Sequence, residues 1–206
     1  MPSRSQDDAG IVVPLRSFTL GKARLAAVLS EHERETLARS MAECVVNAAG
    51  NLPIAVVSSS SEVIAWAREH DYDVVDDPGS LDAAADAGRA WAISRGLSRY
   101  AVVHADLPFA RSLDVVVTDG DALVAVIVPD HRDDGTPVLS LPSSVPFTFA
   151  YGPDSAARHA DEARRRSLSV RILRDPALAF DVDIAADLEA LDALRRTPAP
   201  TPTPTK

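Results

Sequence analysis

Short apolar segments of strand character alternate with helical segments along most of this chain. The apolar segments are rich in β-branched residues, as in Ile11-Val12-Val13 and residues 53–57, and each stops at a proline, a glycine or a polar residue. This alternation is typical of a mostly parallel sheet with helices on both faces. We therefore predict an α/β fold, in which ligands bind beyond the carboxyl ends of the strands.

The predicted elements follow from periodicity and from capping residues. Strands are expected at 11–13, 53–57, 72–75, 100–103, 122–128, 138–141 and 168–173, with further short strands at 147–149 and 179–183. Helices are expected at 31–49, 62–70, 82–95, 113–118, 156–166 and 184–195, the first behind a Ser30/Glu33 capping box.

A length of 206 residues suits one domain of this class. We assign residues 11–196 to a single domain, residues 1–10 to a frayed polar N-terminus, and the Pro/Thr-rich residues 197–206 to a disordered tail. The net charge of −9 argues against a nucleic-acid partner. The chain has no apolar run long enough to span a membrane and no signal pattern, so we expect no membrane partner and a cytoplasmic location. The single cysteine, Cys44, excludes an intramolecular disulfide.

One predicted strand is followed by a candidate functional residue. The apolar run 100–103 is followed by Asp106 and then by Pro108, which cannot donate to a strand ladder. The Asp106 carboxylate is thus expected at the carboxyl end of a strand, where it suits a hard divalent cation such as Mg²⁺. From this stretch alone, an aspartate that only caps a helix or starts a turn is equally compatible.

A loop after the first strand carries three cations, Arg16, Lys22 and Arg24. Such a loop at a strand end can meet the oxygens of a triphosphate, with forked hydrogen bonds from arginine and a point charge from lysine. It is not a Walker loop, because the required glycine and lysine spacing is missing. A solvated basic loop without a ligand is the alternative reading.

Two further carboxylates, Asp181 and Asp183, share one side of the expected strand 179–183. A cation shared with Asp106 would offset their mutual repulsion. Asp183 also stands where it can cap the last helix, which leaves Asp181 as the better metal candidate. Gly152 and Ser155 stand at a predicted helix start, where free backbone N–H groups attract anions, and with Thr136 they could hold a phosphate or a carboxylate.

Several strings in this order resemble one enzyme family over residues 11–191. They are Val13-Pro14-Leu15-Arg16, Gly21-Lys22-Ala23-Arg24-Leu25, Ala105-Asp106-Leu107-Pro108, Gly135-Thr136, residues 151–159 and Asp181-Val182-Asp183 with Asp187-Leu188. The pattern is similar to the guanylyltransferases of coenzyme F420 biosynthesis, which act on phosphoenolpyruvate or 2-phospho-L-lactate. The resemblance implies a nucleotide-diphospho-sugar-transferase-like fold (GT-A-like, Rossmann-like).

The resemblance also implies a reaction and roles. GMP would pass from GTP to a small phosphorylated carboxylate with release of pyrophosphate, helped by Mg²⁺, and the oligomeric state stays open to a homodimer. Lys22, Asp106 and Asp181 would be catalytic, and Asp106, Asp181 and Asp183 would hold the metal. The remaining roles are acceptor binding by Thr136, Gly152 and Ser155, and nucleotide binding by Arg16, Lys22, Arg24 and Asp82.

The chain departs from the family pattern in two places. It has Asp133-Asp134-Gly135-Thr136-Pro137 where the family usually has Gly-Thr-Gly-Thr-Asn, and Ser80-Leu81-Asp82 where it has Gly-Leu-Asn. Two extra carboxylates near an anionic acceptor would oppose its binding unless a cation intervenes. A transferase with another nucleotide or acceptor, and a non-catalytic paralogue that binds nucleotide or a partner, therefore remain alternatives.

Overall fold

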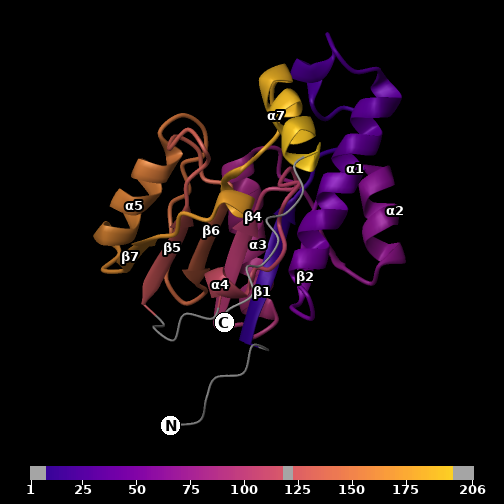
Figure 1. The fold of residues 1–206 in the computed structure, drawn as a ribbon. Helices are drawn as coiled ribbons and strands as arrows, with labels where there is room; N and C mark the ends of the chain where they lie inside the picture. Colours follow the sequence, from indigo (N-terminus) through magenta and orange to yellow (C-terminus); the bar gives the residue numbers. More distant parts are fainter. Residues whose placement is uncertain (1–7, 118–122, 197–206) are drawn as a thin grey trace, which may run out of the picture.

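The computed structural model describes residues 8–117 and 123–196, which form a seven-stranded sheet in the order β3-β2-β1-β4-β6-β5-β7 (Figure 1). Neighbouring strands are parallel except at β6, which runs antiparallel to both β4 and β5. The predicted mostly parallel α/β sheet is thus confirmed. The strands are β1 (Ala9–Pro14), β2 (Ile54–Val57), β3 (Asp73–Val75), β4 (Arg99–Val103), β5 (Val124–Val128), β6 (Val138–Pro142) and β7 (Ser169–Ile172).

Helices cover both faces of the sheet. They are η2 (Ala23–Leu25), α1 (Glu31–Ala48), α2 (Ser61–Glu69), α3 (Leu81–Ser94), α4 (Asp114–Val117), α5 (Ser155–Arg165), α6 (Pro176–Ala179) and α7 (Ala185–Arg196). Ile11 and Val13 pack with α1, α2 and α4 in one apolar cluster, whereas Val12 packs with α3 and α5 in another. This division follows from the two-residue period of a strand. Within the described ranges, no helix has both the length and the apolar character needed to cross a membrane.

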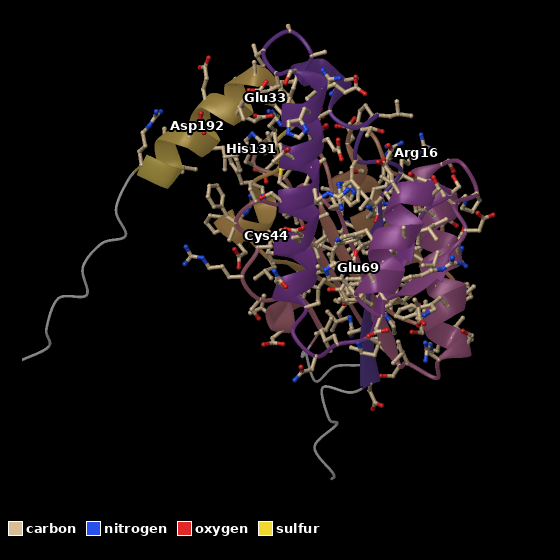
Figure 2. The ribbon with its side chains drawn as sticks, turned by 90° about the vertical axis from the view of Figure 1, so that its right-hand side faces the viewer. Arg16, Glu33, Cys44, Glu69, His131 and Asp192 are labelled. Atoms are coloured by element: carbon tan, nitrogen blue, oxygen red, sulfur yellow. The ribbon has the colours of Figure 1, made fainter. Side chains whose placement is uncertain are left out.

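A third, smaller cluster joins the two ends of the chain. Leu25 of η2, Met41 of α1, Val182 and Leu191 of α7 are all buried against one another. Both views place α7 beside the end of α1 at which that helix begins (Figures 1 and 2). The segment that carries Asp181 is therefore packed against the segment that carries Lys22.

Caps and boundaries mostly follow the sequence. Ser30 and Glu33 form the predicted capping box, and the Ser80 hydroxyl caps α3. The first strand begins at Ala9, two residues before the predicted start, and Ala9 is buried in the sheet. The predictions for residues 1–7, 118–122 and 197–206 lie outside the described residues.

Two predicted strands are wrong, and side chains explain both. At 147–149 the backbone donors bond to α5 instead of to a strand, since Thr148 N–H donates to Glu162 and Ala150 N–H donates to His159. At 179–183 the Asp175 side chain caps α6, which ends at Ala179, and the following residues form an irregular strap.

Candidate active site

The predicted site residues gather at one edge of the sheet. Asp106 follows the carboxyl end of β4, and because β6 is antiparallel, Thr136 precedes β6 at the same edge. A hydrogen bond from His104 N–H to Pro137 O, 2.9 Å long, ties the two segments together. The strap then brings Asp181 to this edge, where Val182 N–H donates to Asp106 O over 3.4 Å.

Lys22, Asp106 and Asp181 form the centre of the site. The Lys22 ammonium lies 2.6 Å from Asp106 Oδ2, and only 11% of its side chain is exposed. Lys22 has a left-handed backbone, with φ of 57°, which is uncommon for a lysine and frequent at functional sites. The predicted proximity of the loop lysine to the strand-end carboxylate is therefore present in the structure.

The two carboxylates have opposite electrostatic environments. Burial would raise the pKa of Asp106, but the charge and hydrogen bond of Lys22 and the nearby His104 outweigh it, so that this pKa is lowered. Burial raises the pKa of Asp181, and the negative charge of Asp106 raises it further. Asp106 is thus paired closely with a nearly buried ammonium, whereas the basic groups paired with Asp181 lie further away, His131 at 3.3 Å and Arg132 at 3.9 Å.

Each of these carboxylates has one buried oxygen without a hydrogen bond, although Arg132 also lies 3.9 Å from that oxygen of Asp181. Asp106 Oδ1 and Asp181 Oδ1 accept no hydrogen bond from the described residues, although His131 Nδ1 lies 3.3 Å from the latter. Two hard anionic oxygens that lack donors fit Mg²⁺, which binds one or two carboxylates together with substrate phosphates and water. The donor set therefore suits a cation that phosphate oxygens complete.

Asp183 does not join this pair. Its carboxylate forms an ion pair with Arg24, and its backbone N–H donates to Asp187 Oδ2 over 2.9 Å. Within residues 8–117 and 123–196, no group of three or more histidine, cysteine or acidic side chains is placed to hold a metal ion. The prediction that Asp183 is a third ligand has no support in this geometry, and Arg24 is occupied by Asp183.

A pocket of about 550 Å³ opens from Asp106 towards the N-terminal half of the sheet. Arg16 and Lys22 line it, together with Met41 of α1 and residues 79–81 at the start of α3. Arg16 donates to Gly79 O across the mouth and remains 67% exposed. Figure 2 shows Arg16, which lines the pocket, and His131, which pairs with Asp181, on opposite sides of α1 in that view.

Asp82, predicted to contact the nucleotide, has another partner. Its Oδ1 accepts a 2.7 Å hydrogen bond from Tyr151 N–H, and its neighbours Leu81 and Ala84 line the pocket instead. Asp82 therefore joins α3 to the segment that leads into α5.

The basic loop has an anchor that the sequence analysis missed. Glu62 Oε1, on α2, accepts hydrogen bonds from Ser17 Oγ at 2.7 Å and from Phe18 N–H at 2.9 Å, and it also receives the Thr19 N–H and hydroxyl. Burial would raise the pKa of Glu62, but these hydrogen bonds prevail and lower it. The carboxylate thus fixes the loop between β1 and Lys22.

A second anchor that the sequence analysis missed holds the strap. Asp187, on α7, accepts from Asp183 N–H and Ile184 N–H and pairs with Arg132. Burial opposes the charged form of Asp187, but these hydrogen bonds and Arg132 lower its pKa overall. Only the family string that contains Asp187 could have indicated this role.

The predicted acceptor residues form a buried group. Thr136 Oγ1 lies 3.1 Å from Ser155 Oγ, and both side chains are about 1% exposed. Gly152 has φ of 106°, which favours glycine, and its carbonyl accepts from Ser155 N–H.

The two extra acids of this loop have partners. Asp133 pairs with Arg174, and Asp134 accepts from Asp154 N–H and Ala156 N–H through its side chain and its carbonyl. The amides at the start of α5, predicted to be free for an anion, are thus largely occupied by the protein itself. Asp154 stands at the N-cap position without a side-chain cap bond.

A cation-bearing loop after β1, a carboxylate after β4 and a second carboxylate on a returning strap define a nucleotidyltransferase-like α/β protein. A solved structure from Desulfovibrio desulfuricans G20, assigned to the nucleotide-diphospho-sugar transferases, superposes with a TM-score of 0.76 at 16% identity and covers 92% of this chain and 88% of its own. The chain belongs to the "Guanylyl transferase CofC like" family, whose model matches residues 9–192. It is therefore a nucleotidyltransferase.

The chain is also similar to two curated relatives whose names state a transferred group and an acceptor. A phosphoenolpyruvate guanylyltransferase of Sphaerobacter thermophilus is 36% identical over 192 residues, which cover 87% of this chain and 90% of the relative. A 3-phospho-D-glycerate guanylyltransferase of Phenylobacterium zucineum is 31% identical over 87% of each chain. The names of these relatives share guanylyl transfer and differ in the acceptor.

Proposed function

We propose that this enzyme transfers GMP from GTP to a small phosphorylated carboxylate, phosphoenolpyruvate in the first instance, and releases pyrophosphate. The observation that carries the proposal is the Asp106–Asp181 pair, with one buried oxygen on each side that accepts no hydrogen bond, beside a pocket that Asp106, Arg16 and Lys22 line. The names of the relatives support the guanylyl group and the phosphorylated carboxylate. A place in coenzyme F420 biosynthesis rests on the sequence resemblance.

Asp106 and Asp181 would hold Mg²⁺, which supplies charge neutralisation for the triphosphate and the leaving pyrophosphate. The acceptor phosphate oxygen forms a bond to the α-phosphorus of GTP while the bond from that phosphorus to the bridging oxygen of the β-phosphate breaks. No protein nucleophile is required. The residues of the chain would therefore position the two substrates and neutralise the charge of the triphosphate. Lys22 and Arg16 provide cations along the pocket.

The acceptor would lie on the other side of Asp106, near Thr136 and Ser155. The acids of the acceptor loop do not oppose an anion as their sequence suggests, because Asp133 is neutralised by Arg174 and Asp134 is bound to backbone N–H groups. A second acceptor, 3-phospho-D-glycerate, is favoured by the name of one relative and carries the same two anionic groups.

The test is a pyrophosphate-release assay with each of the four ribonucleoside triphosphates against phosphoenolpyruvate, 2-phospho-L-lactate and 3-phospho-D-glycerate. We expect release only when GTP, Mg²⁺ and one of these acceptors are present together. Preference for another triphosphate would overturn the nucleotide assignment. Calorimetric binding of GTP without any product would support a non-catalytic paralogue instead.

A further inference from the structure

A histidine that the proposed reaction does not use lies directly behind the acceptor residues. His159, on the second turn of α5, is fully buried, and its Nδ1 lies 3.1 Å from Thr136 Oγ1. Thr136 Oγ1 in turn lies 3.1 Å from Ser155 Oγ. The three side chains form a single row that ends at Ser155.

The other ring nitrogen fixes where the histidine proton resides. His159 Nε2 lies 3.1 Å from Ala150 N, and because a backbone N–H can only donate, Nε2 must accept. Burial lowers the pKa of His159 to about 4, with smaller opposing and supporting effects of Asp82, Arg158 and His104. The ring is therefore neutral near pH 7, carries its proton on Nδ1, and donates to Thr136.

A count of hydrogens shows what this tautomer achieves. Thr136 and Ser155 have two hydroxyl hydrogens, and the bond between them uses one. With His159 as the donor to Thr136, the second hydrogen is left over. With the opposite tautomer, Thr136 would donate to Nδ1, Ser155 would donate to Thr136, and the pair would present only lone pairs.

An anionic acceptor needs that remaining hydrogen. Phosphate and carboxylate groups accept hydrogen bonds and are repelled by lone pairs. The amides of Asp154, Ser155 and Ala156, which a helix start would otherwise offer to an anion, already donate to Asp134 and Gly152. The hydroxyl pair is thus one of the few donors that the start of α5 retains.

We infer that His159 is a positioning residue, whose tautomer, fixed by Ala150 N–H, keeps one hydroxyl hydrogen of the Thr136–Ser155 pair available to an anionic group of the acceptor. This inference rests on the proposed function for the role of the acceptor, but not for the tautomer.

The tautomer is measured in the wild-type protein without substrate, from the ring nitrogen resonances in ¹⁵N NMR at pH 7. We expect His159 to carry its proton on Nδ1. A proton on Nε2, or a doubly protonated ring, would overturn the inference. Absence of turnover with every acceptor would instead refute the proposed function and leave this result unchanged.

Two variants of nearly equal size test the polarity. In His159→Asn the side-chain amide can donate to Thr136, whereas in His159→Asp the carboxylate can only accept. We expect the KM for phosphoenolpyruvate to be at least about tenfold higher in the Asp than in the Asn variant, as for loss of a donor to a charged group, with the KM for GTP within about twofold.

Equal acceptor KM values in the two variants, both shown to be folded by thermal melting, would overturn the inference. If His159→Asp does not fold, the wild-type ¹⁵N measurement decides, because it needs no variant.

Discussion

The proposed nucleotide side and the proposed acceptor side of this sheet edge are built in different ways. On the nucleotide side, Arg16 is 67% exposed and the loop is fixed from behind by Glu62. On the acceptor side, Thr136, Ser155 and His159 are each at most about 1% exposed and bond to one another. The first arrangement would place exposed charge beside the triphosphate, whereas the second sets a few buried donors in fixed positions. Under the proposed function, affinity for the triphosphate and discrimination among acceptors would thus depend on separate structures.

The largest effect is expected from substitution of Asp106, which lies between the proposed nucleotide side and the proposed acceptor side. Asp106→Asn should lower kcat at least about 10³-fold with every acceptor. It removes one of the two carboxylates proposed to hold Mg²⁺ and leaves Lys22 without its counter-charge. Steady-state pyrophosphate release measures the loss. Asp161→Asn, at an exposed residue paired only with Arg164, serves as the matched control and should be unchanged. Full turnover in Asp106→Asn would refute the proposal that Asp106 holds Mg²⁺.

Lys22→Met tests whether one residue of the basic loop dominates nucleotide binding, with Arg24→Met as its matched control. Lys22 lines the pocket and is nearly buried, whereas Arg24 is exposed and paired with Asp183. We expect kcat/KM for GTP to fall about 10²-fold in Lys22→Met and less than about threefold in Arg24→Met. Equal losses would show that the whole loop acts as a diffuse cationic surface.

Asp181→Asn separates stability from cation binding. Because the pKa of Asp181 is raised in the folded state, its charge opposes folding at neutral pH, and this penalty disappears as pH falls through the raised pKa. In EDTA the variant should therefore melt at a higher temperature than the wild type. Added Mg²⁺ should stabilise the wild type and not the variant. A lower melting temperature in EDTA would contradict this account.

A further effect, on stability alone, is expected at the support of residues 147–149. Glu162 accepts from Thr148 N–H, Arg165 and Arg166; burial opposes its charge, but these partners prevail and lower its pKa to about 2. Its contribution to stability is present above the unfolded value of 4.5 and is lost as pH falls towards 2.

Glu162→Gln should therefore cost about 1 to 2 kcal/mol in urea unfolding at pH 7, and the difference from wild type should shrink at pH 3. A constant difference at both pH values would exclude the ionic explanation.

The sequence predicted the sheet well because its strands are local apolar runs with clear stops, such as 100–103 before Pro108. The proximity of Lys22, Asp106 and Asp181 was also anticipated, although Asp181 was placed at the end of a strand that does not exist. The apolar residues Ala179, Phe180 and Val182 suggested that strand, and the cap by Asp175 prevents it.

What could not be predicted depends on contacts between distant residues. Glu62 anchors a loop 43 to 45 residues earlier in the chain, and nothing in its local pattern distinguishes it from a solvated helix acid. Likewise, Asp134 was interpreted as a repulsive charge, since its backbone partner at Asp154 is visible only in three dimensions.

The small cluster of Leu25, Met41, Val182 and Leu191 has a consequence for how the enzyme comes into being. Asp181, one of the two carboxylates proposed to hold Mg²⁺, comes late in the sequence. The apolar contacts that position it also support the loop that carries Lys22, which comes early. A nascent chain emerges N-terminal end first, so the loop, the pocket walls and Asp106 all leave the ribosome before the second carboxylate. Under the proposed function, the site is therefore complete only after Asp181 has been synthesised, and a translation product interrupted before it would lack the second carboxylate.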